Sequence, residues 1–71
     1  MKLVVNGESR ELPEALTVAE LVAGEAPGLG DGRGLAVAVD AEIVPRSAWP
    51  ETRLEEGQRV EVLAAMQGGG A

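Results

Sequence analysis

Hydrophobic and polar residues alternate at the start of the chain. In the stretch Lys2 to Asn6, Leu3 and Val5 fall on one face of a predicted strand. The pair Asn6-Gly7 is typical of a two-residue hairpin turn, because both central residues of a type I′ turn need positive φ angles. Glu8 to Leu12 then returns as a polar strand, which we expect at a sheet edge. The pattern predicts an N-terminal β-hairpin.

The spacing of hydrophobic residues then changes from every second residue, as in a strand, to the three- and four-residue spacing of a helix. Thr17 followed by Glu20 is a capping box, in which each side chain reaches a free backbone N–H group of the first turn. Val18, Leu21 and Val22 recur at helical spacing, so one stripe of this helix faces a core. We expect the helix to end near residue 25, where glycine and proline become frequent.

The second half of the chain returns to strand patterns. We predict a strand at Leu35 to Asp40, a very short one at Ile43-Val44 and a final strand at Arg59 to Met66. An irregular segment around Trp49 and a turn at Leu54 to Gln58 separate the last two. One helix packed across one face of a small mixed sheet of four to five strands, an α+β architecture, suits this order of elements.

Strand alternation also predicts which side chains lie on the face away from the helix. They are small and apolar, with charged residues at the margins, and comprise Val4, Ala36, Ala38, Leu63 and Ala65. Single apolar residues on a surface are ordinary, but a cluster rimmed by charge favours a partner surface. Leu63 and Ala65 lead directly toward the C-terminal residues, so we predict that this face, continued by Met66 and Gln67, binds a partner.

Composition narrows the class of partner. The chain has 71 residues, which suits one domain, and a formal net charge of −6. An acidic surface repels phosphate backbones, and a single Trp without Phe or Tyr offers no platform for stacking bases, so we expect no nucleic acid partner. No apolar run is long enough to span a bilayer, and the first residues turn polar too soon for a signal peptide. We expect a cytoplasmic protein without a membrane partner.

Residues for catalysis are scarce. The sequence contains neither His nor Cys, which removes the usual base for a Ser or Thr nucleophile, a thiol nucleophile and the common zinc ligands. Gly28 to Gly34 is rich in glycine, but it follows a helix and not a strand, which favours a connector over a phosphate-binding loop. We expect no enzyme, no metal site and no bound cofactor.

The C-terminal residues have a different character. No charged side chain occurs from Val62 to Ala71. We expect a domain over residues 1–66 and a flexible tail over residues 67–71, whose five residues would reach on the order of 17 Å when extended. Glycine lets a backbone pass close to the walls of another protein, and such a tail can offer only its terminal carboxylate.

Two segments carry a family resemblance. "IVPRSAW" at Ile43 to Trp49 and "LEEGQRVEVLAAMQGG" at Leu54 to Gly69, together with the opening "VVNGE" and the "GLAVAVD" strand, resemble the thiamine-biosynthesis sulfur carriers. This family is ubiquitin-like, so the resemblance implies a β-grasp fold. Within the first segment we assign structural roles to Pro45, Arg46 and Trp49, because large aromatic residues usually serve packing.

The resemblance also implies a mechanism. In the family, an E1-like adenylating enzyme uses ATP to activate the terminal glycine, and sulfur relayed from a persulfide converts it to a C-terminal thiocarboxylate. Thiazole synthase then takes the sulfur into the thiazole ring of thiamine. The family ends at Gly-Gly, which aligns with Gly68 and Gly69, so Gly69 is the expected sulfur-bearing position, flanked by Gly68 and Gly70.

The residues Gly70-Ala71 depart from the family pattern. A processing peptidase could trim them, the partner enzymes could tolerate them, or they could be a cloning artefact. Other readings of the chain also stay open. They are a sulfur carrier for molybdopterin, cysteine or a sulfur-containing natural product, a ubiquitin-like protein modifier, and a passive β-grasp interaction module.

Overall fold

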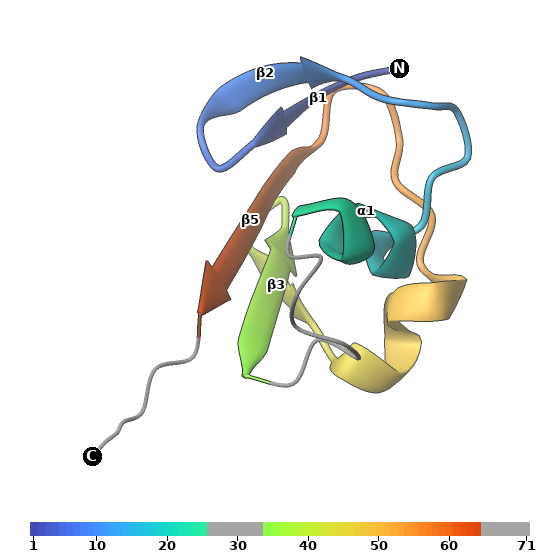
Figure 1. Ribbon diagram of the computed structural model, residues 1–71. Helices are drawn as coiled ribbons and strands as arrows, with labels where there is room; N and C mark the ends of the chain where they lie inside the picture. Colours follow the sequence, from blue (N-terminus) through green and yellow to red (C-terminus); the bar gives the residue numbers. More distant parts are fainter. Residues whose placement is uncertain (26–33, 65–71) are drawn as a thin grey trace.

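The computed structural model describes residues 1–25 and 34–64, which form a five-stranded mixed sheet with one α-helix across one face (Figure 1). The strand order is β2-β1-β5-β3-β4, and the first and last strands run parallel at the centre. This is the β-grasp arrangement that the family resemblance implies. The elements are β1 (Lys2–Val5), β2 (Glu8–Glu11), α1 (Val18–Glu25), β3 (Leu35–Val39), β4 (Glu42–Val44), the 3-10 helix η1 (Arg46–Glu51) and β5 (Arg59–Ala64).

Both hairpins of the sheet turn through two residues with positive φ. In the first, Asn6 and Gly7 have φ angles of 51° and 83°, which confirms the predicted type I′ geometry. In the second, which joins β3 to β4, the corresponding residues are Asp40 and Ala41, with φ angles of 50° and 71°. Ala41 carries a Cβ atom in a region that favours glycine, so this turn is strained.

The start of α1 has the predicted cap. The Thr17 backbone N–H donates to Glu20 Oε1 at 2.9 Å, and the Glu20 N–H donates to Thr17 Oγ1 at 3.2 Å. Val18, Leu21 and Val22 are buried, as their helical spacing predicts. The capping box therefore fixes where the helix begins, and its apolar stripe fixes which side meets the sheet.

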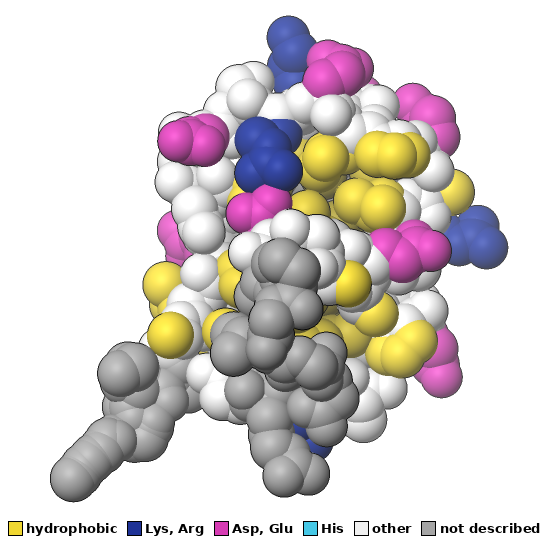
Figure 2. All heavy atoms as spheres, in the orientation of Figure 1, with side chains coloured by type: hydrophobic (Ala, Val, Ile, Leu, Met, Phe, Trp, Pro, Cys, Tyr) yellow, Lys and Arg dark blue, Asp and Glu magenta, His cyan; other side chains and the backbone are white. Residues whose placement is uncertain are grey.

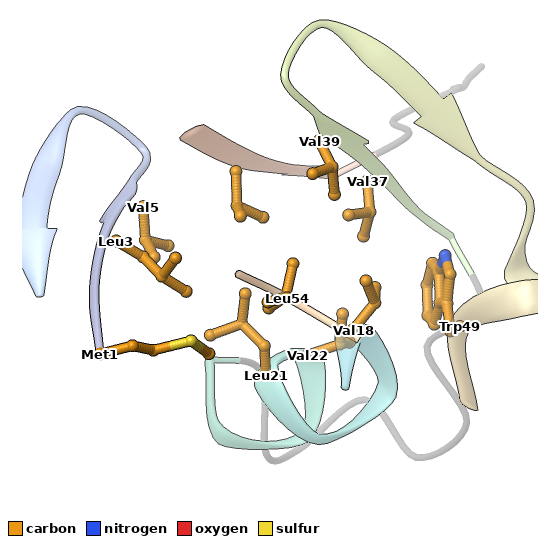
Figure 3. Close-up of a cluster of buried hydrophobic side chains, with 11 residues drawn as sticks. Met1, Leu3, Val5, Val18, Leu21, Val22, Val37, Val39, Trp49 and Leu54 are labelled. Carbon is orange, nitrogen blue, oxygen red and sulfur yellow. The ribbon is translucent and has the colours of Figure 1, made fainter. Parts of the chain in front are cut away.

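The core fills the space between the sheet and α1 (Figure 3). Two of its members were not expected from the sequence, since Met1 was not placed in any element and Leu54 was expected in a turn. Trp49 is buried, as expected of a packing residue, but the segment around it is the short helix η1 and not irregular. The Trp49 Nε1–H donates to the Val44 carbonyl at 2.9 Å, and this hydrogen bond connects η1 to the edge strand β4.

Ion pairs lie at the margin of this core and on the surface, and two of them join the N-terminus of Met1 to Glu11 and Glu14. Arg10 on β2 pairs with Glu25 at the end of α1, with 2.7 Å between nitrogen and oxygen. The hydrogen bond and negative charge of Glu25 raise the pKa of the Arg10 guanidinium. Acidic side chains are distributed over the face seen in Figure 2 and do not gather in one place. Within residues 1–25 and 34–64, no helix is both long and apolar enough to cross a membrane.

Candidate functional site: the open face of the sheet

The side of the sheet away from α1 carries a compact set of apolar residues. The antiparallel register places Leu63 of β5 opposite Ala36 of β3, and Ala38 of β3 opposite Ile43 of β4. Residues paired in this way point to the same face of a sheet. We call Ala36, Ala38, Ile43 and Leu63 the apolar patch.

The two large residues of the patch are the ones that face solvent. Ile43 is 70% exposed and Leu63 is 56% exposed, and they are the exposed large hydrophobic residues of the described chain. Ala36 is half-buried and Ala38 is only 9% exposed. The short alanine side chains therefore lie lower on the surface than those of Ile43 and Leu63. A partner would therefore touch Ile43 and Leu63 most and Ala38 least.

Ile43 was not among the residues predicted for this face. The signal for it was present in the sequence, because a two-residue turn after β3 sets the register that pairs Ile43 with Ala38. The sequence placed Ile43 in a strand but did not assign the strand a register, and so the most exposed apolar residue was missed.

Val4 lies on the same face but apart from the patch. It is half-buried and pairs with Arg59, at the opposite end of β5 from Leu63. Arg59 and Leu63 lie four positions apart along the strand, which is about 13 Å. The prediction grouped Val4 with Leu63 by alternation alone, and the structure does not bring the two together.

Two side chains hold β5 in place beside the patch. The Arg59 N–H donates to Asp40 Oδ1 at 2.9 Å, and the Val62 N–H donates to Asn6 Oδ1 at 2.9 Å. Each acceptor comes from a hairpin turn at the sheet's margin. The strand that carries Leu63 is thus fixed to both neighbouring strands by side chains as well as by backbone pairing.

The predicted C-terminal site lies beyond this strand. Ala65, Met66, Gln67, Gly68, Gly69 and Gly70 are all outside the described residues, and so is Ala71. The last described residue, Ala64, ends β5 directly after Leu63. The patch is therefore the described surface nearest in sequence to the predicted sulfur-bearing glycine.

The described residues offer little else for chemistry. They enclose no pocket, and residues 1–25 and 34–64 hold no group of three or more His, Cys, Asp or Glu side chains that could bind a metal ion. What this surface can do chemically is to bury apolar area against another protein.

Comparison with known proteins shows which family this chain resembles in sequence and in fold. The family model of the ThiS family matches residues 3–69. A crystal structure of the thiamine biosynthesis protein ThiS from Geobacter metallireducens superposes with a TM-score of 0.80 at 31% identity, covering 97% of this chain and all of that one. A solution structure of a thiamine biosynthesis protein from the same organism gives a TM-score of 0.73 at 32% identity, covering 97% and 88%.

A longer relative is also similar. A thiazole synthase from Paramagnetospirillum magneticum is 41% identical over 70 residues, which are 97% of this chain and 20% of that protein. The chain thus spans about a fifth of the length of this curated relative. The family match over nearly the whole chain, the close structural likeness and the shared β-grasp fold agree, and the chain belongs to the ThiS family.

Proposed function

We propose that this chain carries sulfur as a C-terminal thiocarboxylate and donates it to the formation of the thiazole ring in thiamine biosynthesis. The observation that carries the proposal is the ThiS-family match, which extends through the Gly-Gly motif and ends at Gly69. The apolar patch supports it, because a carrier must present a recognisable surface close to its reactive end.

The proposed chemistry needs no catalytic side chain on the carrier. A carboxylate is a poor acyl donor because its leaving group would be oxide. In the proposed cycle, an E1-like adenylating enzyme attaches AMP from ATP to the carboxylate, with release of pyrophosphate. AMP is then a good leaving group when the outer sulfur of a persulfide attacks the same carbonyl carbon, which gives an acyl disulfide. A thiol reductant must then cleave the S–S bond to leave the thiocarboxylate. The chain is a carrier and not a catalyst in this scheme, and it holds no cofactor of its own.

We assign the sulfur to Gly69, with Gly68 before it and Gly70 after it. The end of the family match at Gly69 supports this assignment. Glycines would let the backbone enter a narrow active-site channel, since they present no side chain to its walls. In this proposal a peptidase removes Gly70-Ala71, and the intact form is not the active carrier.

Two proteins would use the apolar patch in turn. The first is the adenylating enzyme, and the second is a sulfur-accepting synthase. The thiazole synthase named among the relatives supports a synthase of that kind as the acceptor. The adenylation step uses ATP and the next step uses a persulfide donor, both of which the cytoplasm supplies, so we place the protein in the cytoplasm.

Mass spectrometry of three forms tests the proposal. The full chain, a chain ending at Gly69 and a chain ending at Gly68 are each incubated with the adenylating enzyme of the same genome, ATP and a sulfur donor. We expect only the chain ending at Gly69 to gain the mass of one oxygen atom replaced by sulfur. Conversion of the full chain would refute the trimming step. Failure of all three forms would contradict sulfur carriage itself.

A second stage tests the pathway. The converted chain ending at Gly69 is mixed with thiazole synthase and its other substrates, and loss of the thiocarboxylate is followed by mass. We expect the original carboxylate to return only when the synthase is active. A thiocarboxylate that persists with active synthase would point to another acceptor, such as an enzyme of molybdopterin or cysteine formation.

A further inference from the structure

One carboxylate borders the apolar patch. Glu61 is exposed on β5, directly opposite Ala38 and two residues before Leu63 on the same face. Ala38 is in turn paired with Ile43, so these three residues form one row across three strands. A protein that covers Ile43 and Leu63 must also approach Glu61.

Glu61 has no cationic partner within the described residues. The ion pairs there involve Glu11, Glu14 and Glu25, and none includes Glu61. Arg59 points to the same face two residues earlier, about 7 Å along the strand, and makes no ion pair with it. Within residues 1–25 and 34–64, this exposed carboxylate therefore has no ion-pair partner.

Covering the patch would remove the water around this carboxylate. Desolvating an unpaired carboxylate is strongly unfavourable unless a cation or hydrogen-bond donors replace the water. The covering surface must then combine an apolar contact for Ile43 and Leu63 with a basic side chain opposite Glu61.

A second copy of this chain is a poor match to that requirement. In a symmetric dimer the same patch faces itself, so the apolar contact is limited to the projecting side chains of Ile43 and Leu63 from each copy. The two projecting side chains also cover much less than the roughly 800 Å² per partner of a standard stable interface. The occupant is thus a different protein, bound transiently.

We propose that Glu61 forms an ion pair with a Lys or Arg of the adenylating enzyme and so fixes the register in which the apolar patch docks. This inference rests on the function proposed above. The adenylating enzyme must recognise the chain before any sulfur is attached, so recognition at this step depends on the body and on unmodified C-terminal residues. An ion pair beside Ala38 and Leu63 supplies the specificity that two aliphatic side chains cannot provide.

A charge reversal with a matched control tests the inference. Glu61→Arg and Glu42→Arg change the net charge equally, and both residues are exposed on strands. Glu42 pairs with Val39 and so belongs to the opposite face. Adenylation by the enzyme of the same genome is measured as ATP–pyrophosphate exchange. We expect Glu61→Arg to lower kcat/KM at least about tenfold, mainly through KM, and Glu42→Arg to change it less than about twofold.

Further measurements separate an ion pair from a structural role. Glu61→Gln should lower kcat/KM less than Glu61→Arg, and should reduce the dependence of the rate on salt concentration. Reversing the charge of one basic residue on the enzyme should restore activity with Glu61→Arg. Thermal unfolding, followed by the fluorescence of Trp49, should be unchanged in each variant.

The outcomes distinguish this inference from the proposed function. If the unaltered chain supports no exchange in any of its three terminal forms, the proposed function fails. If it supports exchange but Glu61→Arg behaves like Glu42→Arg, only the role of Glu61 is wrong. A loss that appears with thiazole synthase but not with the adenylating enzyme would also overturn the assignment.

Discussion

The two faces of the sheet are built from the same strands and differ in what covers them. On the inner face, Leu3, Val5, Val37 and Val60 are almost completely buried beneath α1. On the outer face, small alanines lie between the exposed side chains of Ile43 and Leu63. The inner face is closed within the chain, whereas the outer face keeps apolar area in water. If the outer face binds the proposed partner, stability and recognition are separable, and substitutions on the two faces should have different readouts.

The largest effect is expected on the inner face. Leu3 is fully buried, and Leu3→Ala should lower the free energy of unfolding by about 3 kcal/mol through lost burial and a residual cavity. Urea denaturation followed by Trp49 fluorescence measures this change. For a chain of this size the loss is a large part of the total stability. A loss below about 1 kcal/mol would mean that the inner face is not the main source of stability.

The opposite result is expected on the outer face. Leu63→Ala and Ile43→Ala should each weaken binding to the adenylating enzyme about tenfold, because each removes a projecting contact from the patch. Stability should change by less than about 1 kcal/mol, since both side chains already face water. Titration calorimetry and urea denaturation give the two quantities. Unchanged binding in both variants would remove the patch from the proposed interface.

A smaller effect is expected at the cap of α1, the helix that covers the inner face. Thr17→Ala removes the hydroxyl that accepts the Glu20 N–H, and should lower the free energy of unfolding by about 1 kcal/mol. Thr17→Ser keeps an acceptor oxygen and is the control. Binding to the adenylating enzyme should be the same for both variants, because α1 lies on the covered side. A binding defect specific to Thr17→Ala would show that the faces are coupled.

The smallest expected effect is an increase in stability. Ala41 has a φ angle of 71° in the turn before Ile43, and Ala41→Gly should relieve the strain and raise stability by about 0.5 kcal/mol. Asp40→Gly is the contrasting variant, because it also removes the acceptor for the Arg59 N–H and should be destabilising. Thermal unfolding midpoints compare the two. A lower midpoint for Ala41→Gly would mean that the turn gains more from a restricted unfolded chain than it loses to strain.

Local signals in the sequence account for most of the fold that was predicted. The Asn6-Gly7 turn, the Thr17–Glu20 cap and the alternation in the strands each act within a few residues, and the structure confirms all three. The family resemblance is likewise confirmed by the ThiS match. The roles of Gly68, Gly69 and Gly70 stay predictions, because they concern residues outside the described ranges.

The predictions that were wrong concern residues whose surroundings come from segments distant in the sequence. Leu54 follows no periodic pattern, yet it is 3% exposed because its backbone N–H donates to the Leu16 carbonyl, which brings it beside the helix start. Val4 and Leu63 share a face, but they are separated along the sheet because β1 pairs only with the beginning of β5. Alternation reports the face of a residue and not its distance from another strand's residues.

The sequence by itself determined the strands and α1, the cap of α1, the apolar periodicity and the membership of the ThiS family, since each depends on short-range geometry or on sequence motifs. Only the tertiary structure decided which apolar residues remain exposed together. That choice depends on strand order and register, through which Ile43, Ala38 and Glu61 become neighbours. The turn at Asp40-Ala41 fixes the pairing of Ala38 with Ile43, but the pairing of β3 with β5 joins residues far apart in the chain, and no local pattern specifies it.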